Sequence, residues 1–182
     1  MYKRQTLDRL VDETRAVFGS RTRIWLTEYA YQTNPPDRLL GVSKARQALF
    51  IGESANRVYR APRVDMLIHF LVRDDSWAPG WQSGLFTRAG SGKPALNAFL
   101  FPLAQVSRSG ARAVLWGQVR PRTGAQTYRL RISTRGGWRW LGGTRRTNSR
   151  GIFTVNVTAP RGARVQLFSP RDKRYSPALT LG

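Results

Sequence analysis

The sequence predicts an α/β segment over residues 1–103, followed by a small antiparallel β-sandwich over residues 104–182. Helical and strand-like patterns of apolar residues alternate through the first segment, which is the order of an α/β protein. Beyond residue 104, apolar residues recur at every second position in short runs, as in half-buried strands. The charge balance changes at the same place. The first segment has 15 basic and 9 acidic residues, and the second has 16 basic residues and one acid, Asp172.

The first helix and the first strand are predicted near the N-terminal end of the chain. Apolar residues recur at spacings of three, four and seven over residues 4–18, which predicts an amphipathic helix that ends at Gly19. A short apolar strand follows over residues 23–28. Ser43 is a suitable N-cap for a second helix over residues 43–60, where apolar residues repeat with a helical period.

A second strand and a third helix complete the α/β segment. Residues 64–72 form a nearly continuous apolar run, which is typical of a parallel strand buried on both faces. A third helix is predicted to begin near Pro94 and carries apolar residues through Leu100. The elements therefore follow one another as consecutive units of an α/β protein.

Five short strands are predicted in the basic C-terminal segment. They cover residues 111–119, 127–132, 138–141, 152–157 and 163–168. Turns rich in glycine separate them, and residues 104–110 are predicted to be a polar connector between the two segments. This spacing of strands indicates a sandwich of about 75 residues. Its arginines, such as Arg129 and Arg131, fall on the outward phase of the alternation, which predicts a solvated face.

The composition excludes several kinds of site. The absence of cysteine excludes disulfides, thiolate metal sites and a cysteine nucleophile. His69 is the only histidine, and we interpret it as a core residue with a satisfied hydrogen bond, so no metal site is predicted. The run Gly90-Ser91-Gly92-Lys93 lacks the first glycine of a phosphate-binding loop, and Pro94 replaces its Ser or Thr, so no nucleotide cofactor is predicted. No apolar run reaches the length of a membrane span, and the first ten residues do not form a signal peptide.

The net charge of +21 predicts electrostatic attraction to polyanions. Of the 31 basic residues, 27 are arginine and 4 are lysine, a bias that often reflects the codon usage of a GC-rich genome. The arginines lie singly, as at Arg129, Arg131, Arg135 and Arg139, rather than in one compact block. Specific nucleic-acid recognition is therefore not expected.

Two neighbouring strands are predicted to end in carboxylates. Glu28 lies at the end of the strand over residues 23–28, before a loop with Asn34-Pro35-Pro36. This is how α/β barrels present catalytic acids, although an ordinary strand end with a solvated glutamate has the same pattern. The second strand leads into Arg73-Asp74-Asp75. Arg73 is predicted to pair with these carboxylates and to keep Glu28 ionised.

Aromatic residues follow both strand ends. Trp77 and Trp81 come after the second strand, and Tyr31 and Gln32 come after the first. Sugar sites combine carboxylates with flat indole faces, so we predict that the tryptophans stack on a sugar. The alternatives are that the tryptophans cover the mouth of a barrel, and that Tyr31 and Gln32 order their loop instead of binding substrate.

Three motifs in this region resemble the last two β/α units of clan A glycoside hydrolases, most closely the secreted, actinobacterial members with (β/α)8 barrels. The motifs are Trp25-Leu26-Thr27-Glu28-Tyr29, then Arg73-Asp74-Asp75, then Gly80-Trp81-Gln82-Ser83-Gly84-Leu85 before Lys93-Pro94-Ala95. The resemblance covers about residues 1–102 and implies that Glu28, at the end of strand seven, is the nucleophile of a retaining double displacement. Substrate contacts are predicted for Tyr31, Gln32, Asp74, Trp77, Trp81 and Gln82. The C-terminal segment resembles the Ig-like sandwich of such enzymes, and the parent enzyme is expected outside the cell or on its surface.

The departures from this family are equally informative. A complete barrel has eight strands, and this chain supplies two. The acid/base glutamate of the family lies on strand four, usually after an asparagine, and no Asn-Glu pair occurs here. We therefore expect the chain to be a C-terminal fragment with little or no glycosidase activity of its own.

Two other function classes remain open. The basic sandwich would serve as a non-catalytic module that binds carbohydrate or an anionic cell-wall polymer. Alternatively, it would be a spacer that packs on the barrel and binds nothing.

Overall fold

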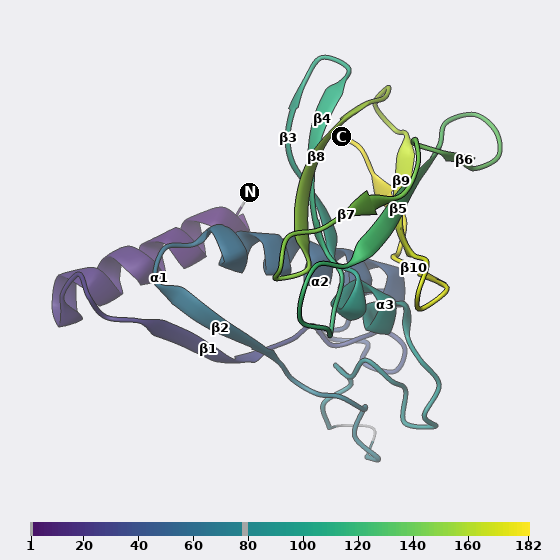
Figure 1. Ribbon diagram of the computed structural model, residues 1–182. Coiled ribbons are helices and arrows are strands. Elements are labelled where there is room, and N and C mark those ends of the chain that lie inside the picture. Colours follow the sequence, from purple (N-terminus) through teal and green to yellow (C-terminus); the bar gives the residue numbers. More distant parts are fainter. Residues whose placement is uncertain (1, 78–79) are drawn as a thin grey trace.

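The computed structural model describes residues 2–77 and 80–182, and within them the α/β segment contains three helices and two strands (Figure 1). They are α1 (Tyr2–Phe18), β1 (Ile24–Tyr29), α2 (Lys44–Arg60), β2 (Val64–His69) and α3 (Pro94–Leu100). The order and type of these elements are as predicted, and β2 ends three residues early. The Ser43 side chain caps α2 by accepting a hydrogen bond from the Arg46 backbone N–H at 3.2 Å.

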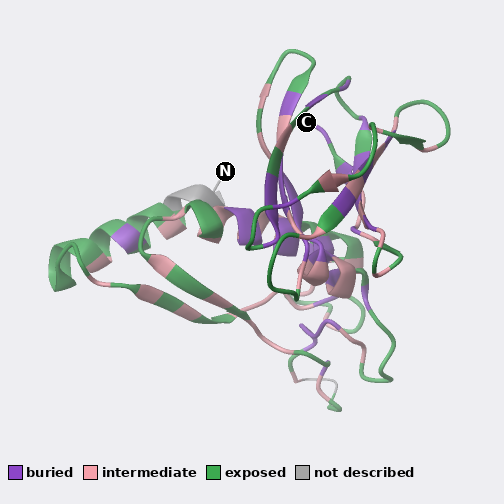
Figure 2. Cartoon of the chain, viewed as in Figure 1, coloured by how far each residue is buried: buried purple, intermediate pink, exposed green. Residues whose placement is uncertain are grey.

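β1 and β2 form a parallel pair, in which Leu26 lies opposite Leu67. α2 packs on one face of the pair (Figure 1). The other face carries Trp25, which is 63% exposed, together with exposed Met66 and Ile68. The parallel pairing is confirmed. The prediction that the second strand is buried on both faces is wrong, because nothing among the described residues covers this second face (Figure 2).

The C-terminal part is built from nine short strands within the described residues. They are β3 (Leu103–Ser109), β4 (Arg112–Gln118), β5 (Thr127–Ser133), β6 (Arg139–Trp140), β7 (Arg145–Arg146), β8 (Ile152–Thr158), β9 (Arg164–Ser169), β10 (Arg174–Tyr175) and β11 (Leu179–Thr180). One sheet has the order β3-β4-β8. The other has the order β10-β9-β5-β6, with β7 on β5 and β11 on β9. All these pairings are antiparallel, as predicted.

The predicted connector over residues 104–110 is wrong, since most of it belongs to strand β3. β3 pairs antiparallel with β4, and Leu103 and Ala104 at its start are buried. The residues after Ala104 are mostly polar, so they show no apolar alternation that would predict a strand. Backbone hydrogen bonds to β4 form the strand instead. The short strands β7, β10 and β11 likewise had no pattern of their own. The division of the chain near residue 103 stays a prediction.

The sandwich core lies between the two sheets. Leu115 of β4 and Leu130 of β5 are fully buried in it, as are Val165 and Leu167 of β9. The rings of Tyr128 and Phe153 stack with centroids 3.9 Å apart. Facing residues of the two sheets therefore interdigitate into one apolar layer, as in other sandwiches.

α2 joins the α/β segment to the sandwich. A Cβ atom at Gly52 would lie 2.9 Å from the Leu103 carbonyl oxygen, so the helix and β3 approach more closely there than any side chain permits. One turn further on, Ala55 packs with Trp116 and Ile152 in a small buried cluster. The two parts therefore share a packed boundary along one face of α2.

A substitution in the sandwich core should affect stability more than one on the uncovered face of the β1–β2 pair. Leu130→Ala should lower the free energy of unfolding by about 2–5 kcal/mol, because it leaves a cavity in the sandwich core. Trp25→Thr should change it by no more than about 0.5 kcal/mol, because Trp25 contributes little buried area. Urea unfolding followed by circular dichroism measures both. If Trp25→Thr lowered the free energy of unfolding as much as Leu130→Ala, the conclusion that this sheet face is uncovered would be wrong.

Candidate functional site

The carboxyl ends of β1 and β2 lie next to each other. Glu28 is the penultimate residue of β1 and its side chain is exposed. Just beyond β2, the Phe70 N–H donates a hydrogen bond to the Tyr29 carbonyl at 3.0 Å, which extends the pairing past the last strand residue. The loops that follow both strands therefore start from one edge of the parallel pair, where α/β proteins bind their ligands.

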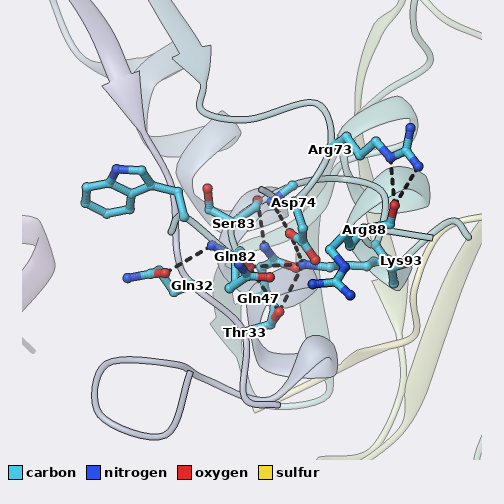
Figure 3. Close-up of polar contacts among 12 residues, drawn as sticks. Gln32, Thr33, Gln47, Arg73, Asp74, Gln82, Ser83, Arg88 and Lys93 are labelled. Carbon is cyan, nitrogen blue, oxygen red and sulfur yellow. Dashed lines mark hydrogen bonds and ion pairs between the residues drawn. The ribbon is translucent and has the colours of Figure 1, made fainter. Parts of the chain in front are cut away.

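A buried ammonium group ties these loops together. Lys93 Nζ lies 2.6 Å from Asp74 Oδ1, and the two side chains are 0% and 5% exposed. The same ammonium donates to Thr33 Oγ1 at 2.9 Å and to the Gln82 carbonyl at 3.0 Å (Figure 3). Lys93 stands just before α3, so one side chain links the start of that helix to the loops after β1 and β2.

The environment of this pair opposes ionisation of the lysine. Burial lowers the pKa of Lys93, and the contact with Asp74 partly offsets that shift. Asp74 Oδ1 also accepts a hydrogen bond from the Gly84 N–H at 2.8 Å. A Cβ atom at Gly84 would lie 2.4 Å from the Asp74 backbone nitrogen, so glycine is required for this close approach.

Gln82, predicted to contact substrate, is buried at the centre of this network. Its carbonyl accepts from the Thr33 N–H at 3.1 Å as well as from Lys93. Its N–H donates to Gln32 Oε1 at 3.0 Å, and its side-chain amide donates to the Trp77 carbonyl at 3.1 Å. The structure thus brings three predicted site residues together, Gln32, Asp74 and Gln82.

A pocket of about 360 Å³ opens beside the network. Its lining includes Asp74 and Gln82 together with two cations, Lys44 and Arg88, and the prolines Pro35 and Pro36. Most of the surface of this pocket is apolar, although charged and amide side chains contribute to its lining. Glu28 is not among its lining residues.

The predicted aromatic residues lie around the same loops in different environments. Trp77 and Trp81 are 68% and 54% exposed, and the Trp81 and Phe70 rings lie nearly perpendicular with centroids 5.9 Å apart. Tyr31 is half-buried, with the Phe50 ring centroid 4.7 Å away and the Tyr29 ring centroid 5.6 Å away. Both indoles are therefore largely exposed to solvent, whereas Tyr31 is part of a packed aromatic cluster.

The predicted pairing of Arg73 with carboxylates is wrong. Arg73 donates to the Arg88 carbonyl from Nε at 2.9 Å and from Nη2 at 2.5 Å (Figure 3). The neighbouring carboxylates are occupied by other donors, Asp74 by Lys93 and Asp75 by the Trp81 N–H at 2.6 Å. No ion pair of Arg73 is found within the described part of the chain, so the idea that it keeps Glu28 ionised has no support.

His69 is half-buried rather than a core residue, and the predicted hydrogen bond is present at one of its two ring nitrogens. Its Nε2 donates to the Ser83 carbonyl at 3.0 Å. Its Nδ1 is buried and has no partner among the residues the structure describes. Burial lowers the pKa of His69, and the charge of Lys93 lowers it further.

Sequence reasoning missed three residues that build the site. Lys93 was noted only as part of a motif, and Thr33 and Gln47 were not considered. Gln47, buried in α2, donates to the Tyr31 carbonyl at 2.9 Å and to the Ser83 carbonyl at 3.0 Å. A polar residue on the apolar face of a predicted helix was the one available indication of this role.

Two further observations concern metal ions and membranes. Over residues 2–77 and 80–182, no group of three or more His, Cys, Asp or Glu side chains is placed to hold a metal ion. In the same residues, no helix combines the length and the apolar character needed to cross a bilayer.

Comparisons with known proteins give one kind of match. No protein-family model and no curated protein matches the chain. Among solved structures, Bacteroides uniformis β-glucuronidase 2 bound covalently to cyclophellitol-6-carboxylate aziridine matches with a TM-score of 0.46 and 11% identity. A calcium-binding mutant of that enzyme matches with a TM-score of 0.46 and 12% identity.

These alignments cover 98% of this chain but 24% and 23% of the two solved chains. The chain thus spans about a quarter of the length of the proteins it matches. At this TM-score and identity the likeness carries no argument about fold or function.

Removal of the buried ammonium should destabilise the protein strongly. Lys93→Met should lower the free energy of unfolding by about 3–5 kcal/mol, because it leaves the Asp74 carboxylate buried without its cation. Combining it with Asp74→Asn should recover part of this loss, because no unpaired charge remains. Urea unfolding of both variants measures the effect. Arg9→Met, which breaks an exposed pair with Glu13, serves as the control and should have little effect.

His69 should make stability depend on pH. Its pKa in the folded state is below the ordinary value of 6.5, so the unfolded chain binds more protons between these two values. The free energy of unfolding should therefore fall as the pH drops below about 6.5. Because carboxylates titrate as well, the measured quantity is the difference between wild type and His69→Gln in urea unfolding from about pH 7.5 to about pH 5. Parallel curves for the two proteins would contradict the prediction.

Proposed function

We propose that the chain is the C-terminal part of a retaining glycoside hydrolase that acts on O-glycosidic bonds of a polysaccharide or oligosaccharide. The observation that carries this proposal is the position of Glu28. It is an exposed carboxylate at the carboxyl end of β1, next to the end of a parallel strand whose loop holds Asp74 and the exposed tryptophans. Catalytic acids of α/β barrels occupy this position.

In the proposed reaction Glu28 is the nucleophile. Its carboxylate attacks the anomeric carbon while a second carboxylic acid protonates the departing glycosidic oxygen, and water then hydrolyses the glycosyl ester. The nearby carboxylates of this chain are poor candidates for the second role. Asp74 is held in a buried ion pair with Lys93, and Asp75 accepts a hydrogen bond from the Trp81 N–H. The acid/base group would therefore come from another strand, outside this chain.

The uncovered face of β1 and β2 agrees with this proposal. Exposed Trp25, Met66 and Ile68 form an apolar surface on the side of the sheet that faces away from α2. Inside a complete barrel, side chains from the other strands would fill this space. The proposal thus accounts for an apolar sheet face that a free-standing domain would bury. The parent enzyme is proposed to act outside the cell or on its surface.

Substrate contacts are proposed for the residues around the strand ends. Exposed Trp77 and Trp81 offer indole faces to the apolar side of a pyranose ring. Gln82 and Asp74 line the adjoining pocket, and Gln32 is bonded to Gln82. Tyr31, two residues after the end of β1, completes the proposed set.

Activity assays test the proposal in two arms. The purified 182-residue chain should not hydrolyse aryl glycosides above background. The chain complemented with a polypeptide that supplies the six missing β/α units and an Asn-Glu strand end should do so. Glu28→Gln should then lower kcat by about 10³-fold or more, because it removes the nucleophile. Glu13→Gln on α1 is the matched control and should leave kcat unchanged.

A chemical experiment identifies the nucleophile directly. A fluorinated glycoside that traps the glycosyl–enzyme ester should add its mass to the peptide that contains Glu28 in the complemented enzyme. Trapping on another carboxylate would overturn the assignment. Turnover by the isolated chain that Glu28→Gln abolishes would show that no other strand is needed.

A further inference from the structure

The outer face of the β5–β9 sheet combines arginines with aromatic rings. β5 buries Tyr128, Leu130 and Ile132 in the sandwich core, so Arg129 and Arg131 point to the opposite side. On β9, Phe168 lies opposite Arg129, and Gln166 lies opposite Arg131. β6 and β10 add further aromatic side chains at the two edges, on the side of the molecule away from α1 (Figure 1). We call this surface the arginine–aromatic face, and its main residues are Arg129, Arg131, Arg164, Trp138, Trp140 and Tyr175.

The guanidinium groups of this face are stacked on the rings. The Cζ atom of Arg129 lies 3.8 Å from the ring centroid of Trp140. The Cζ atom of Arg131 lies 3.6 Å from the ring centroid of Tyr175 and 4.6 Å from that of Trp138. Arg164 lies 5.6 Å from the Trp138 ring centroid. These distances are those of cation–π contacts, which hold a guanidinium plane in a defined orientation. The expectation that the arginines form only a solvated face is therefore too simple, since they belong to an ordered layer.

The positive charge of the face is not neutralised within the described residues. Asp172 is the single acid after residue 103, and it pairs with Arg122 at 3.5 Å. Arg131 donates from Nε and Nη2 to Gln166 Oε1, a neutral acceptor, at 2.9 and 2.6 Å. The Nε of half-buried Arg129 is itself buried and has no hydrogen-bond partner in the described part of the chain, so the charge of this guanidinium is not balanced there. Cations that are partly removed from water without a counter-charge favour binding of an anion.

We propose that the arginine–aromatic face binds an acidic polysaccharide through its carboxylates. A planar guanidinium matches a carboxylate with two parallel N–H···O bonds. Here the terminal Nη groups would donate them, because Arg129 Nε is buried and Arg131 Nε donates to Gln166. The stacked rings have already ordered both side chains. Arg129 and Arg131 alternate on one strand, so their Cα atoms are about 7 Å apart. A chain with a carboxylate on successive sugars contacts both arginines at once, which raises affinity above that of a single anion.

The stacking also distinguishes this ligand from a nucleic acid. Bases bind single-strand platforms by stacking on free aromatic faces. Here the rings of Trp140 and Tyr175 already carry guanidinium groups at 3.8 and 3.6 Å. The choice of a polysaccharide over other polymers with carboxylates rests on the proposed function, which places the sandwich beside a sugar-binding region.

Binding of the full chain to polygalacturonate tests this inference, with neutral dextran and a single-stranded oligonucleotide as comparison ligands. The chain should bind polygalacturonate, should not bind dextran, and should bind more weakly as salt rises. Arg129→Gln combined with Arg131→Gln should weaken binding about tenfold or more, because it removes two charge-assisted contacts. Arg112→Gln combined with Arg161→Gln is the matched control. It removes the same charge from exposed positions elsewhere and should weaken binding about twofold or less.

A second variant separates an ordered face from simple charge attraction. Trp140→Ala keeps the net charge but frees Arg129 from its ring, and should weaken binding about threefold. Unchanged unfolding curves would show that the variants are folded. Equal losses in the two arginine pairs, no effect at Trp140, or tighter binding to the oligonucleotide would each overturn the inference. It does not depend on turnover, so loss of binding with intact trapping at Glu28 would leave the proposed function standing.

Discussion

The buried ammonium of Lys93 is the contact on which the strand-end region depends. The loops after β1 and β2 contain neither helix nor named strand, so pairing within the sheet does not fix their positions. Lys93 reaches from the start of α3 to Asp74, Thr33 and the Gln82 carbonyl, and so connects three segments that are distant in sequence. Burying this charge is costly unless every donor has an acceptor, and here three acceptors surround it. The network therefore defines one arrangement of the loops that display the tryptophans and the pocket.

α2 is the second organising element. One face of this helix packs on the parallel pair, and another packs on β3 of the sandwich. Its polar residue Gln47 ties the loop after β1 to the loop after β2. The close approach at Gly52 and the cluster around Ala55 make the contact with the sandwich specific. The position of the sandwich relative to the strand ends is thus a consequence of packing along one helix.

Positively charged side chains have different partners in the two parts of the protein. In the α/β segment, several cations form ion pairs with carboxylates, as Lys93 does with Asp74 and Arg23 with Asp65. In the sandwich, acids are almost absent, and aromatic rings take their place beside the guanidinium groups. Rings orient a cation but do not neutralise it. The sandwich therefore retains a field that attracts anions, and the arginine–aromatic face gives that field a defined geometry.

The sequence by itself determined the helices, most of the longer strands and the change from α/β to antiparallel order, because hydrophobic periodicity is a local property. It also placed Glu28 at the end of a strand, since the break from apolar residues to a proline-rich loop is local as well. Only the tertiary structure showed that β3 is a strand, that Arg73 turns to the Arg88 carbonyl, and that Asp74 is paired with Lys93. These outcomes depend on which groups meet across long sequence separations, and no spacing along the chain encodes that. The same reason explains why the sequence did not predict the stacking of the β5 arginines on aromatic rings. Alternation predicted that they face outward, but the rings that order them come from β6 and β10, which packing alone brings to the same sheet.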